Sequence, residues 1–201
     1  SVATGSLFYE AEVTMPAEQP LDSSLTTEAP VYFIADAHLG AGEGPREHER
    51  RADLLRLLSS LTGRASHLYL AGDIFDFWFE YPFPTRTPHD EILAGLSALS
   101  DAGTSLHFTG GNHDYWAGRR LAELTGADVH RRPIEAAHFG RRLFVAHGDG
   151  LPRGDVGYRL LKSVIRSRPA IAGFSLIPPR AGAALARWDP TPASPTPLRC
   201  W

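Results

Sequence analysis

The chain has 201 residues, which is enough for one globular domain and too long for a small fold held together by disulfides. Its composition of 43% hydrophobic and 21% charged residues excludes a wholly disordered chain and a bundle of membrane spans. The formal net charge of −3 gives no reason to expect a nucleic-acid partner, and one cysteine, Cys200, excludes an intrachain disulfide. Nine histidines invite a search for metal ligands.

Residues 1–30 are predicted to form a flexible acidic arm. They hold five acidic residues, no Lys or Arg, and prolines at positions 16, 20 and 30, without a hydrophobic period. The basic and apolar regions of a signal peptide are missing, and no stretch approaches the ~20 apolar residues needed to span a bilayer. These features predict a cytoplasmic protein.

From residue 31 onward, short apolar runs alternate with amphipathic stretches. The predicted buried strands cover 31–35, 67–71, 105–109 and 142–146. Two helices are predicted between the first three strands, with apolar faces formed by Leu54, Leu55, Leu57, Leu58 and Leu61, and by Ile92, Leu93, Leu96 and Leu99. This alternation predicts an α/β fold. Residues 128–137 are predicted as two short strands that add antiparallel members to the sheet.

Residues 151–188 are basic, with seven Lys or Arg residues against one acidic residue. Within them, Leu160, Leu161, Val164 and Ile165 share one helical face and the basic residues the other, which is typical of a basic amphipathic helix. An ordinary surface helix explains the pattern equally well. Residues 189–201 carry four prolines and are predicted as an unstructured tail.

Polar clusters follow all four predicted strands. They are Asp36-Ala37-His38, Gly72-Asp73-Ile74-Phe75-Asp76, Gly110-Gly111-Asn112-His113-Asp114 and His147-Gly148-Asp149. Each alone has an ordinary explanation, such as a helix cap at Asp36, a turn at Asp73 or a backbone-bonded imidazole at His147. Because side chains beyond the carboxyl ends of such strands converge on one crevice, the four together predict a shared metal site.

The ligand types indicate the chemistry of that site. Carboxylate, imidazole and amide oxygen ligands suit Mn²⁺, Fe²⁺ or Zn²⁺, and the absence of thiolates argues against structural zinc. One carboxylate can bridge two such ions, which together acidify a water and neutralise a phosphoryl group. Asp73, central among the strands, is the natural bridge. The sequence therefore predicts metal-assisted hydrolysis.

These clusters also resemble a known family. Asp36-x-His38, Gly72-Asp73-x-x-Asp76, Gly111-Asn112-His113-Asp114 and His147-Gly148 resemble the first four of five motifs of the calcineurin-like metallophosphoesterases, whose fold is an αββα sandwich. The stretches 72–81 and 147–151, continuing to Gly157-Tyr158, are similar to the UDP-2,3-diacylglucosamine diphosphatases of lipid A synthesis. The likeness runs from about residue 31 to 188.

The resemblance implies roles for individual residues. It implies two divalent ions, Mn²⁺ with Fe²⁺ or Zn²⁺ as alternatives, the first held by Asp36, His38 and Asp73 and the second by Asp73, Asn112 and His147. His113 is implied as the catalytic residue that steadies charge or protonates the leaving oxygen, with Asp114 orienting its ring. Arg153 and Asp155 are implied to contact substrate, although Asp155 could equally cap the following helix.

The resemblance further implies a substrate and a location. Water attacks the α-phosphorus of UDP-2,3-diacylglucosamine, releasing UMP and 2,3-diacylglucosamine 1-phosphate. The basic insertion receives the acyl chains at an anionic membrane, so the protein is expected to be cytoplasmic and peripheral at the inner membrane. Four aromatic residues either line a neighbouring apolar or base-binding wall or pack in the core: Phe77, Trp78, Phe79 and Tyr81.

One departure from the family pattern keeps alternatives open. No histidine follows His147, so the fifth motif, Gly-His-x-His, is missing, and the sandwich is expected to lack its C-terminal strands. The absence of this motif is expected to impair hydrolysis by the chain. A second interpretation is a metallophosphoesterase of another phosphoester, such as a nucleotide or a phosphoprotein. A third is a catalytically inactive module of the same fold that binds lipid or a protein partner.

Overall fold

The structure is a computed structural model that describes residues 29–42, 44–83, 85, 87–148, 167–179 and 181–182. The predicted acidic arm up to residue 28, the amphipathic helix around residues 160–165 and the tail over residues 189–201 lie outside the described residues. So do Arg153 and Asp155, the two residues implied to contact substrate.

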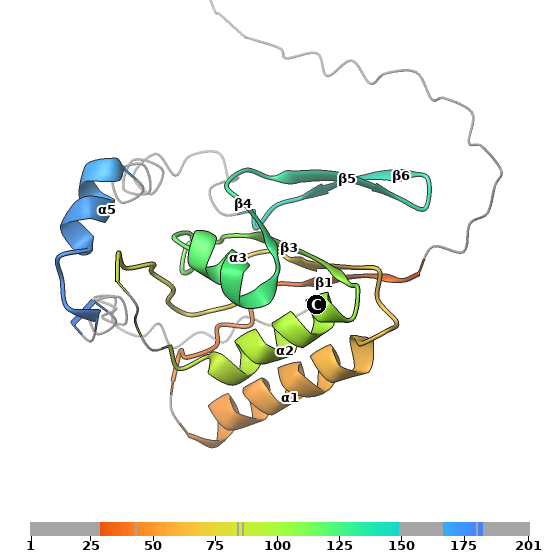
Figure 1. Cartoon of the computed structure of the whole chain (residues 1–201), viewed down its shortest axis with the longest axis horizontal. Helices are drawn as coiled ribbons and strands as arrows, with labels where there is room; N and C mark the ends of the chain where they lie inside the picture. The colour runs from red at the N-terminus through yellow and green to blue at the C-terminus, as the bar shows by residue number, and fades with distance from the viewer. Residues whose placement is uncertain are drawn as a thin grey trace, which may run out of the picture.

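A four-stranded parallel sheet forms the centre of the molecule (Figure 1). Its strands, in spatial order, are β1 (Val31–Ile34), β2 (His67–Leu70), β3 (Ser105–Thr109) and β4 (Asp128–His130). The connecting helices are α1 (Pro45–Leu61), α2 (Asp90–Asp101) and α3 (Arg119–Thr125). The α/β fold and the first three predicted strands are confirmed.

The helices pack on one face of this sheet and form the main hydrophobic core. Because side chains alternate along a strand, every second residue points toward the helices. On the sheet these residues are Tyr32, Ile34, Leu68, Leu70, Leu106, Phe108 and Val129. All four predicted apolar residues of α2 are buried, and α1 contributes Leu54, Leu58 and Leu61. Leu57, predicted on the same face of α1, is instead 40% exposed, because it lies one residue from the buried stripe.

An antiparallel hairpin of β5 (Ile134–His138) and β6 (Arg141–Val145) lies over the opposite face of the sheet (Figure 1). It forms a separate two-stranded sheet, whereas the sequence predicted one sheet with added antiparallel strands. Only Ile134 and Val145 of the hairpin join a buried cluster, with Tyr69 of β2. The predicted burial of the 142–146 strand is therefore wrong for its outer side, where Phe144 is 69% exposed.

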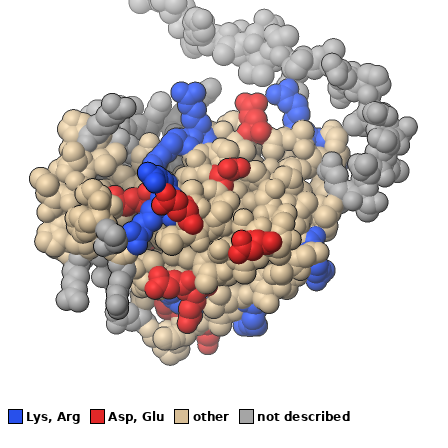
Figure 2. Space-filling view, in the orientation of Figure 1, with Lys and Arg blue, Asp and Glu red and all other residues tan. Residues whose placement is uncertain are grey.

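The described residues thus supply a helical layer, a parallel sheet and a second, smaller sheet, as in the expected metallophosphoesterase sandwich. A further short helix, α5 (Arg168–Phe174), lies in the predicted insertion. None of the helices that the structure describes is long and apolar enough to cross a membrane. On the face shown in Figure 2, acidic and basic residues of the described part are interspersed rather than gathered into one patch.

Glu80 fixes the start of α3, which begins after Gly118 without a side-chain cap of its own. The Glu80 carboxylate accepts hydrogen bonds from the backbone N–H groups of Gly118 (2.7 Å), Arg120 (3.1 Å) and Leu121 (3.0 Å). A carboxylate at this position satisfies N–H groups that have no partner within the helix and interacts favourably with the helix dipole. Glu80 therefore joins the loop after β2 to α3.

We expect Glu80→Gln to lower the free energy of unfolding by about 1–2 kcal/mol, because one charged acceptor for three N–H groups is replaced by a neutral amide. Urea denaturation of the full chain measures the effect. The matched control is Glu123→Gln, which removes an exposed carboxylate paired with Arg119 and should change stability by less than about 0.5 kcal/mol. Equal effects of the two substitutions would contradict a capping role.

His89, just before α2, is a buried histidine that sequence reasoning did not single out. Its Nδ1 lies 3.3 Å from Nη2 of Arg51, and its ring packs 4.7 Å from that of Phe75. Burial, reinforced by the Arg51 charge, lowers the pKa of His89 from 6.5 to about 4. The imidazole is therefore neutral in the folded protein at pH 7.

His89 should make stability fall on acidification. Between pH 6.5 and 4 the unfolded chain binds a proton at this residue that the folded chain does not. The contribution of His89 to the free energy of unfolding is therefore fully present above pH 6.5 and decreases below it. From pH 7 to pH 5 the contribution amounts to about 2 kcal/mol. In urea unfolding at the two pH values, His89→Gln should lose that part of the pH dependence. Exposed His48→Gln should retain it, and identical pH profiles of wild type and His89→Gln would contradict the assignment.

Candidate metal centre

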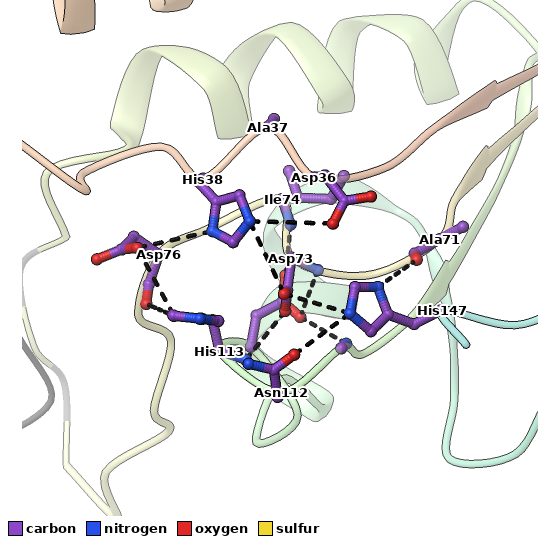
Figure 3. Close-up of polar contacts among 12 residues, drawn as sticks. Asp36, Ala37, His38, Ala71, Asp73, Ile74, Asp76, Asn112, His113 and His147 are labelled. Atoms are coloured by element: carbon purple, nitrogen blue, oxygen red, sulfur yellow. Dashed lines mark hydrogen bonds and ion pairs between the residues drawn. The ribbon is translucent and has the colours of Figure 1, made fainter. Parts of the chain in front are cut away.

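The loops that follow β1, β2, β3 and β6 meet at one edge of the fold and bring all the predicted metal ligands together (Figure 3). Asp36 and His38 follow β1, Asp73 follows β2, Asn112 follows β3 and His147 follows β6. The sequence predicted four equivalent strand ends in one sheet. Three of them belong to the parallel sheet, whereas His147 arrives from the separate hairpin and still reaches Asp73.

The residues predicted for the first ion form one group. Ligand atoms of Asp36, His38 and Asp73 lie within 4.8 Å of one another. Nε2 of His38 is 3.9 Å from Oδ1 of Asp36 and 3.9 Å from Oδ2 of Asp73. Asp36 is exposed and His38 half-buried, so this group is open to solvent on one side.

The residues predicted for the second ion converge on the same carboxylate. Nε2 of His147 lies 3.2 Å from Oδ2 of Asp73 and 3.3 Å from Oδ1 of Asn112. Nδ1 of His147 lies 3.2 Å from the carbonyl oxygen of Ala71, which can only accept, so this nitrogen carries the proton. Nε2 is thereby left with a lone pair toward the site, as a metal-ligating histidine requires. Asp73 is shared by both groups.

Backbone conformations at these strand ends are unusual. Asp36, His38 and Asp73 adopt positive φ angles of 54°, 44° and 52°, a region that non-glycine residues rarely occupy. Hydrogen bonds between the loops hold them there, from Asp36 N to Gly72 O (3.1 Å) and from His38 N to Asp73 O (2.9 Å). Such strain concentrates at functional sites, where it aims side chains that a relaxed turn would direct elsewhere.

Asp114 holds the loops after β2 and β3 together. Its carboxylate is fully buried and accepts hydrogen bonds from the N–H groups of Asp73 (3.1 Å), Ile74 (2.8 Å), Phe75 (3.3 Å) and Gly111 (2.8 Å). Burial raises the pKa of Asp114, and the hydrogen bonds from the backbone act against that rise. Gly111 is required beside it, because a Cβ atom there would overlap the carboxylate of Asp73.

The His113 ring is held by Asp76 rather than by Asp114, its predicted orienting residue. Nδ1 of His113 donates to the backbone oxygen of Asp76 (2.8 Å) and lies 3.6 Å from the Asp76 carboxylate. Asp114 is occupied by its backbone donors, which explains the difference. Asp76 also lies 3.7 Å from Nδ1 of His38, so Asp76, His38 and His113 form a further possible ligand group. The Gly-Asp-x-x-Asp spacing was the sequence signal for Asp76.

The donor set fits divalent metal ions. It offers carboxylate, amide and imidazole atoms without thiolates, which suits ions between hard and borderline character. Within the described part of the chain, the carboxylates of Asp36, Asp73 and Asp76 lie 3.2–3.9 Å from histidine nitrogens and form no ion pair with Lys or Arg. Three neighbouring carboxylates without a basic partner are electrostatically favourable for a cation.

The aromatic residues after Asp76 both pack and line a pocket. Trp78 and Phe79 are buried, and Phe174 of α5 lies 4.7 Å from Phe79 and 6.1 Å from Phe77, measured between ring centroids. A small pocket of about 110 Å³ lies beside these rings. It is lined by Phe77, Trp78, Phe79, Tyr81, Thr85, Thr87, Pro88, Arg120 and Pro179. Some of these aromatic residues therefore pack in the core and others line a pocket wall, so each of the two interpretations from the sequence holds for part of the cluster.

Curated relatives match two thirds to three quarters of this chain. A UDP-2,3-diacylglucosamine hydrolase of Porphyromonas gingivalis is 36% identical over 140 residues, covering 66% of this chain and 53% of that protein. Proteins of the same name from Nitrosococcus oceani and Escherichia coli are each 33% identical, over 75% and 66% of this chain and 58% and 53% of their own lengths. The chain thus spans about half the length of the curated relatives it matches.

A family model for calcineurin-like phosphoesterases matches residues 29–180, which include every predicted metal ligand. The region also contains the parallel sheet, its helices and the hairpin that delivers His147. With the ligand groups assembled at the strand ends, we conclude that the chain belongs to the calcineurin-like phosphoesterase family.

Proposed function

We propose that this chain is a metal-dependent phosphoesterase that hydrolyses the diphosphate of UDP-2,3-diacylglucosamine to UMP and 2,3-diacylglucosamine 1-phosphate. The observation that carries the proposal is the convergence of two ligand groups on the buried carboxylate of Asp73. Support for the substrate comes from the relatives, whose names specify hydrolysis of this compound.

Two divalent ions, with Mn²⁺ as the first choice, would be held by the groups described above. Asp36, His38 and Asp73 would bind one, and Asp73, Asn112 and His147 the other. Bound ions of this type lower the pKa of a coordinated water and neutralise the charge of a phosphoryl group. Asp73 positions both groups, and the proton on Nδ1 of His147 keeps its Nε2 directed at them.

His113 is assigned to the leaving group. In this role the ring acts in its doubly protonated form: Nδ1 donates to the backbone oxygen of Asp76, and the second proton, on Nε2, is donated to a phosphate oxygen or transferred to the departing one. The backbone N–H of His113 donates to Oδ1 of Asp73 (3.0 Å), so the ring is fixed relative to the shared carboxylate. Asp76 is a positioning residue in this scheme.

A location at the cytoplasmic face of the inner membrane is part of the proposal. The substrate carries two acyl chains, and residues 151–188 have an excess of basic residues that would favour an anionic membrane surface. The apolar pocket beside Phe77 and Phe79 is lined in part by Pro179 of the same segment, and Phe174 of α5 lies 4.7 Å from Phe79 between ring centroids. This arrangement suits a substrate with a charged head and apolar tails.

The test is release of UMP from UDP-2,3-diacylglucosamine by the full chain with Mn²⁺. We expect release that stops when a chelator is added and resumes with fresh Mn²⁺. Hydrolysis of a simple phosphodiester without release of UMP would show that UDP-2,3-diacylglucosamine is not the substrate. A rate no higher than that of the Asp73→Asn chain would reject the activity itself.

His113→Asn separates the catalytic role from metal binding. Because His113 is assigned to the leaving oxygen and not to an ion, its loss should lower kcat by about 100-fold or more while the Kd for Mn²⁺ changes by less than about threefold. Steady-state kinetics and Mn²⁺ titration of the same preparation measure both. A parallel loss of Mn²⁺ affinity would show that His113 belongs to a ligand group, as its proximity to His38 and Asp76 allows.

A further inference from the structure

The face of the parallel sheet that meets the hairpin is rich in histidine, unlike the apolar face that meets the helices. At alternate positions, β2 presents His67 and Tyr69, β3 presents His107, and β4 presents Asp128 and His130. In the strand register, Tyr69 lies beside His107 and His107 beside Asp128. The side chains of three adjacent strands thus meet on one surface.

A cavity of about 520 Å³ lies between this surface and the hairpin. The sheet lines it with His67, Tyr69, His107, Asp128 and His130, and the hairpin with residues 134–138. β4 is at one edge of the sheet and Asp128 is exposed, so the cavity is reached from solvent along that edge. This location is on a sheet face, whereas the metal centre described above lies at the strand ends.

Three side chains in the cavity have the donor atoms of a metal site. Ligand atoms of His107, Asp128 and His130 lie within 4.8 Å of one another. Nδ1 of His107 and Nε2 of His130 are buried and have no hydrogen-bond partner. An unpartnered polar atom in a protein interior is unfavourable, and a bound cation would remove that cost at both nitrogens.

Contacts with neighbouring side chains hold the His107 ring in an orientation suited to binding a metal ion. Its Nε2 lies 3.1 Å from Nδ1 of His67, and its ring stacks 4.6 Å from that of Tyr69, so its orientation is fixed. A histidine that binds a metal through one ring nitrogen is usually held in place by a hydrogen bond made through the other.

We propose that His107, Asp128 and His130 form a further divalent transition-metal site, best suited to Zn²⁺, between the sheet and the hairpin. Two imidazoles and one carboxylate are a common Zn²⁺ donor set, with bonds of about 2.0–2.2 Å that side-chain rotations bring within reach from the present separations. A fourth position remains for water. The ion would join edge strand β4 to β3 and is independent of the proposed hydrolysis.

Zn²⁺ titration of the chelator-treated full chain tests the site, using a competing chromophoric chelator to count ions and measure affinity. Asp128→Asn is an isosteric change at an exposed residue, and it should lower the affinity of this site for Zn²⁺ at least about tenfold. At Zn²⁺ concentrations that fill the wild-type site, the wild type should therefore bind one more Zn²⁺ than Asp128→Asn. His130→Asn should behave alike, and exposed His48→Asn on α1 like wild type. Folding of each variant is checked by its thermal transition before Zn²⁺ is added.

Comparison with Asp73→Asn distinguishes the two metal sites. Asp73→Asn should lose ions at the strand ends and keep the Zn²⁺ that depends on Asp128, and the visible absorption of Co²⁺ at this remaining site should disappear in the double variant with Asp128→Asn. Equal Zn²⁺ stoichiometry and affinity in wild type, Asp128→Asn and His130→Asn would overturn the proposal, whatever the hydrolysis assay gives.

Discussion

Asp73→Asn is expected to reduce UMP release by about 10³-fold or more and to abolish tight binding of at least one Mn²⁺. The substitution keeps the shape of the side chain and removes the charge that both ligand groups share. Oδ2 of Asp73 is 3.9 Å from Nε2 of His38 and 3.2 Å from Nε2 of His147, so this single change affects both groups. Initial rates at saturating Mn²⁺ measure the loss.

Asp101→Asn is the matched control for this experiment, because it makes the same chemical change at an exposed residue at the end of α2. It should leave the rate and Mn²⁺ binding unchanged. Far-ultraviolet circular dichroism should show that Asp73→Asn is folded. Retention of more than about a tenth of the wild-type rate by folded Asp73→Asn would contradict the bridging role of Asp73.

Asp114→Asn is expected to lower the free energy of unfolding by about 3–5 kcal/mol. Four backbone N–H groups donate to the carboxylate, and an asparagine offers one acceptor oxygen and turns an NH₂ group toward the other donors. The side chain is fully buried, so water cannot replace the lost acceptor. Urea unfolding measures the change.

The same substitution should also disturb the metal centre, since Asp114 joins the loop of Asp73 to the loop of Asn112 and His113. Asp101→Asn again serves as control. A loss of stability below about 1 kcal/mol for Asp114→Asn would show that the loops are held by other contacts. Weakened Mn²⁺ binding with normal stability would instead assign Asp114 to the metal centre directly.

Much of this architecture was predictable from local patterns. The runs of β1, β2 and β3 are apolar because at least one of their faces is buried, and the stripe of α2 is regular enough to predict all four buried residues. The metal ligands were predictable because carboxylates and histidines followed each strand. For Asp36, His38, Asp73 and Asn112, the meeting depends only on parallel strands ending at one edge of a sheet, whereas His147 comes from the separate hairpin.

Long-range pairing was not predictable in the same way. β4 has three residues, Asp128–His130, too few for a periodic signal, and it pairs in parallel with β3 after the intervening helix α3. The separation of β5 and β6 into their own sheet depends on tertiary contacts with Tyr69. A strand ending at His147 could therefore be predicted, but not the sheet to which it belongs.

Contacts between side chain and backbone were also missed. Glu80 was noticed only as part of a motif, yet its three bonds are to the start of α3, 38 to 41 residues further along the chain. Asp76 was quoted without a role and holds the His113 ring through its backbone oxygen as well as its carboxylate. The histidines of β2, β3 and β4 carried a signal, but His67 and His107 lie within strands that were interpreted only as buried, and His130 lies within a predicted short strand that was given no role.

The most direct test of the central claim is electron paramagnetic resonance during Mn²⁺ titration of the chelator-treated full chain, compared with Asp73→Asn. If Asp73 bridges two ions, the wild type binds two Mn²⁺ at the strand ends with a spectrum of spin-coupled ions, and Asp73→Asn gives no coupled signal. Binding of isolated, uncoupled Mn²⁺ only, or the same spectrum from Asp73→Asn, would contradict a dinuclear centre built on this carboxylate.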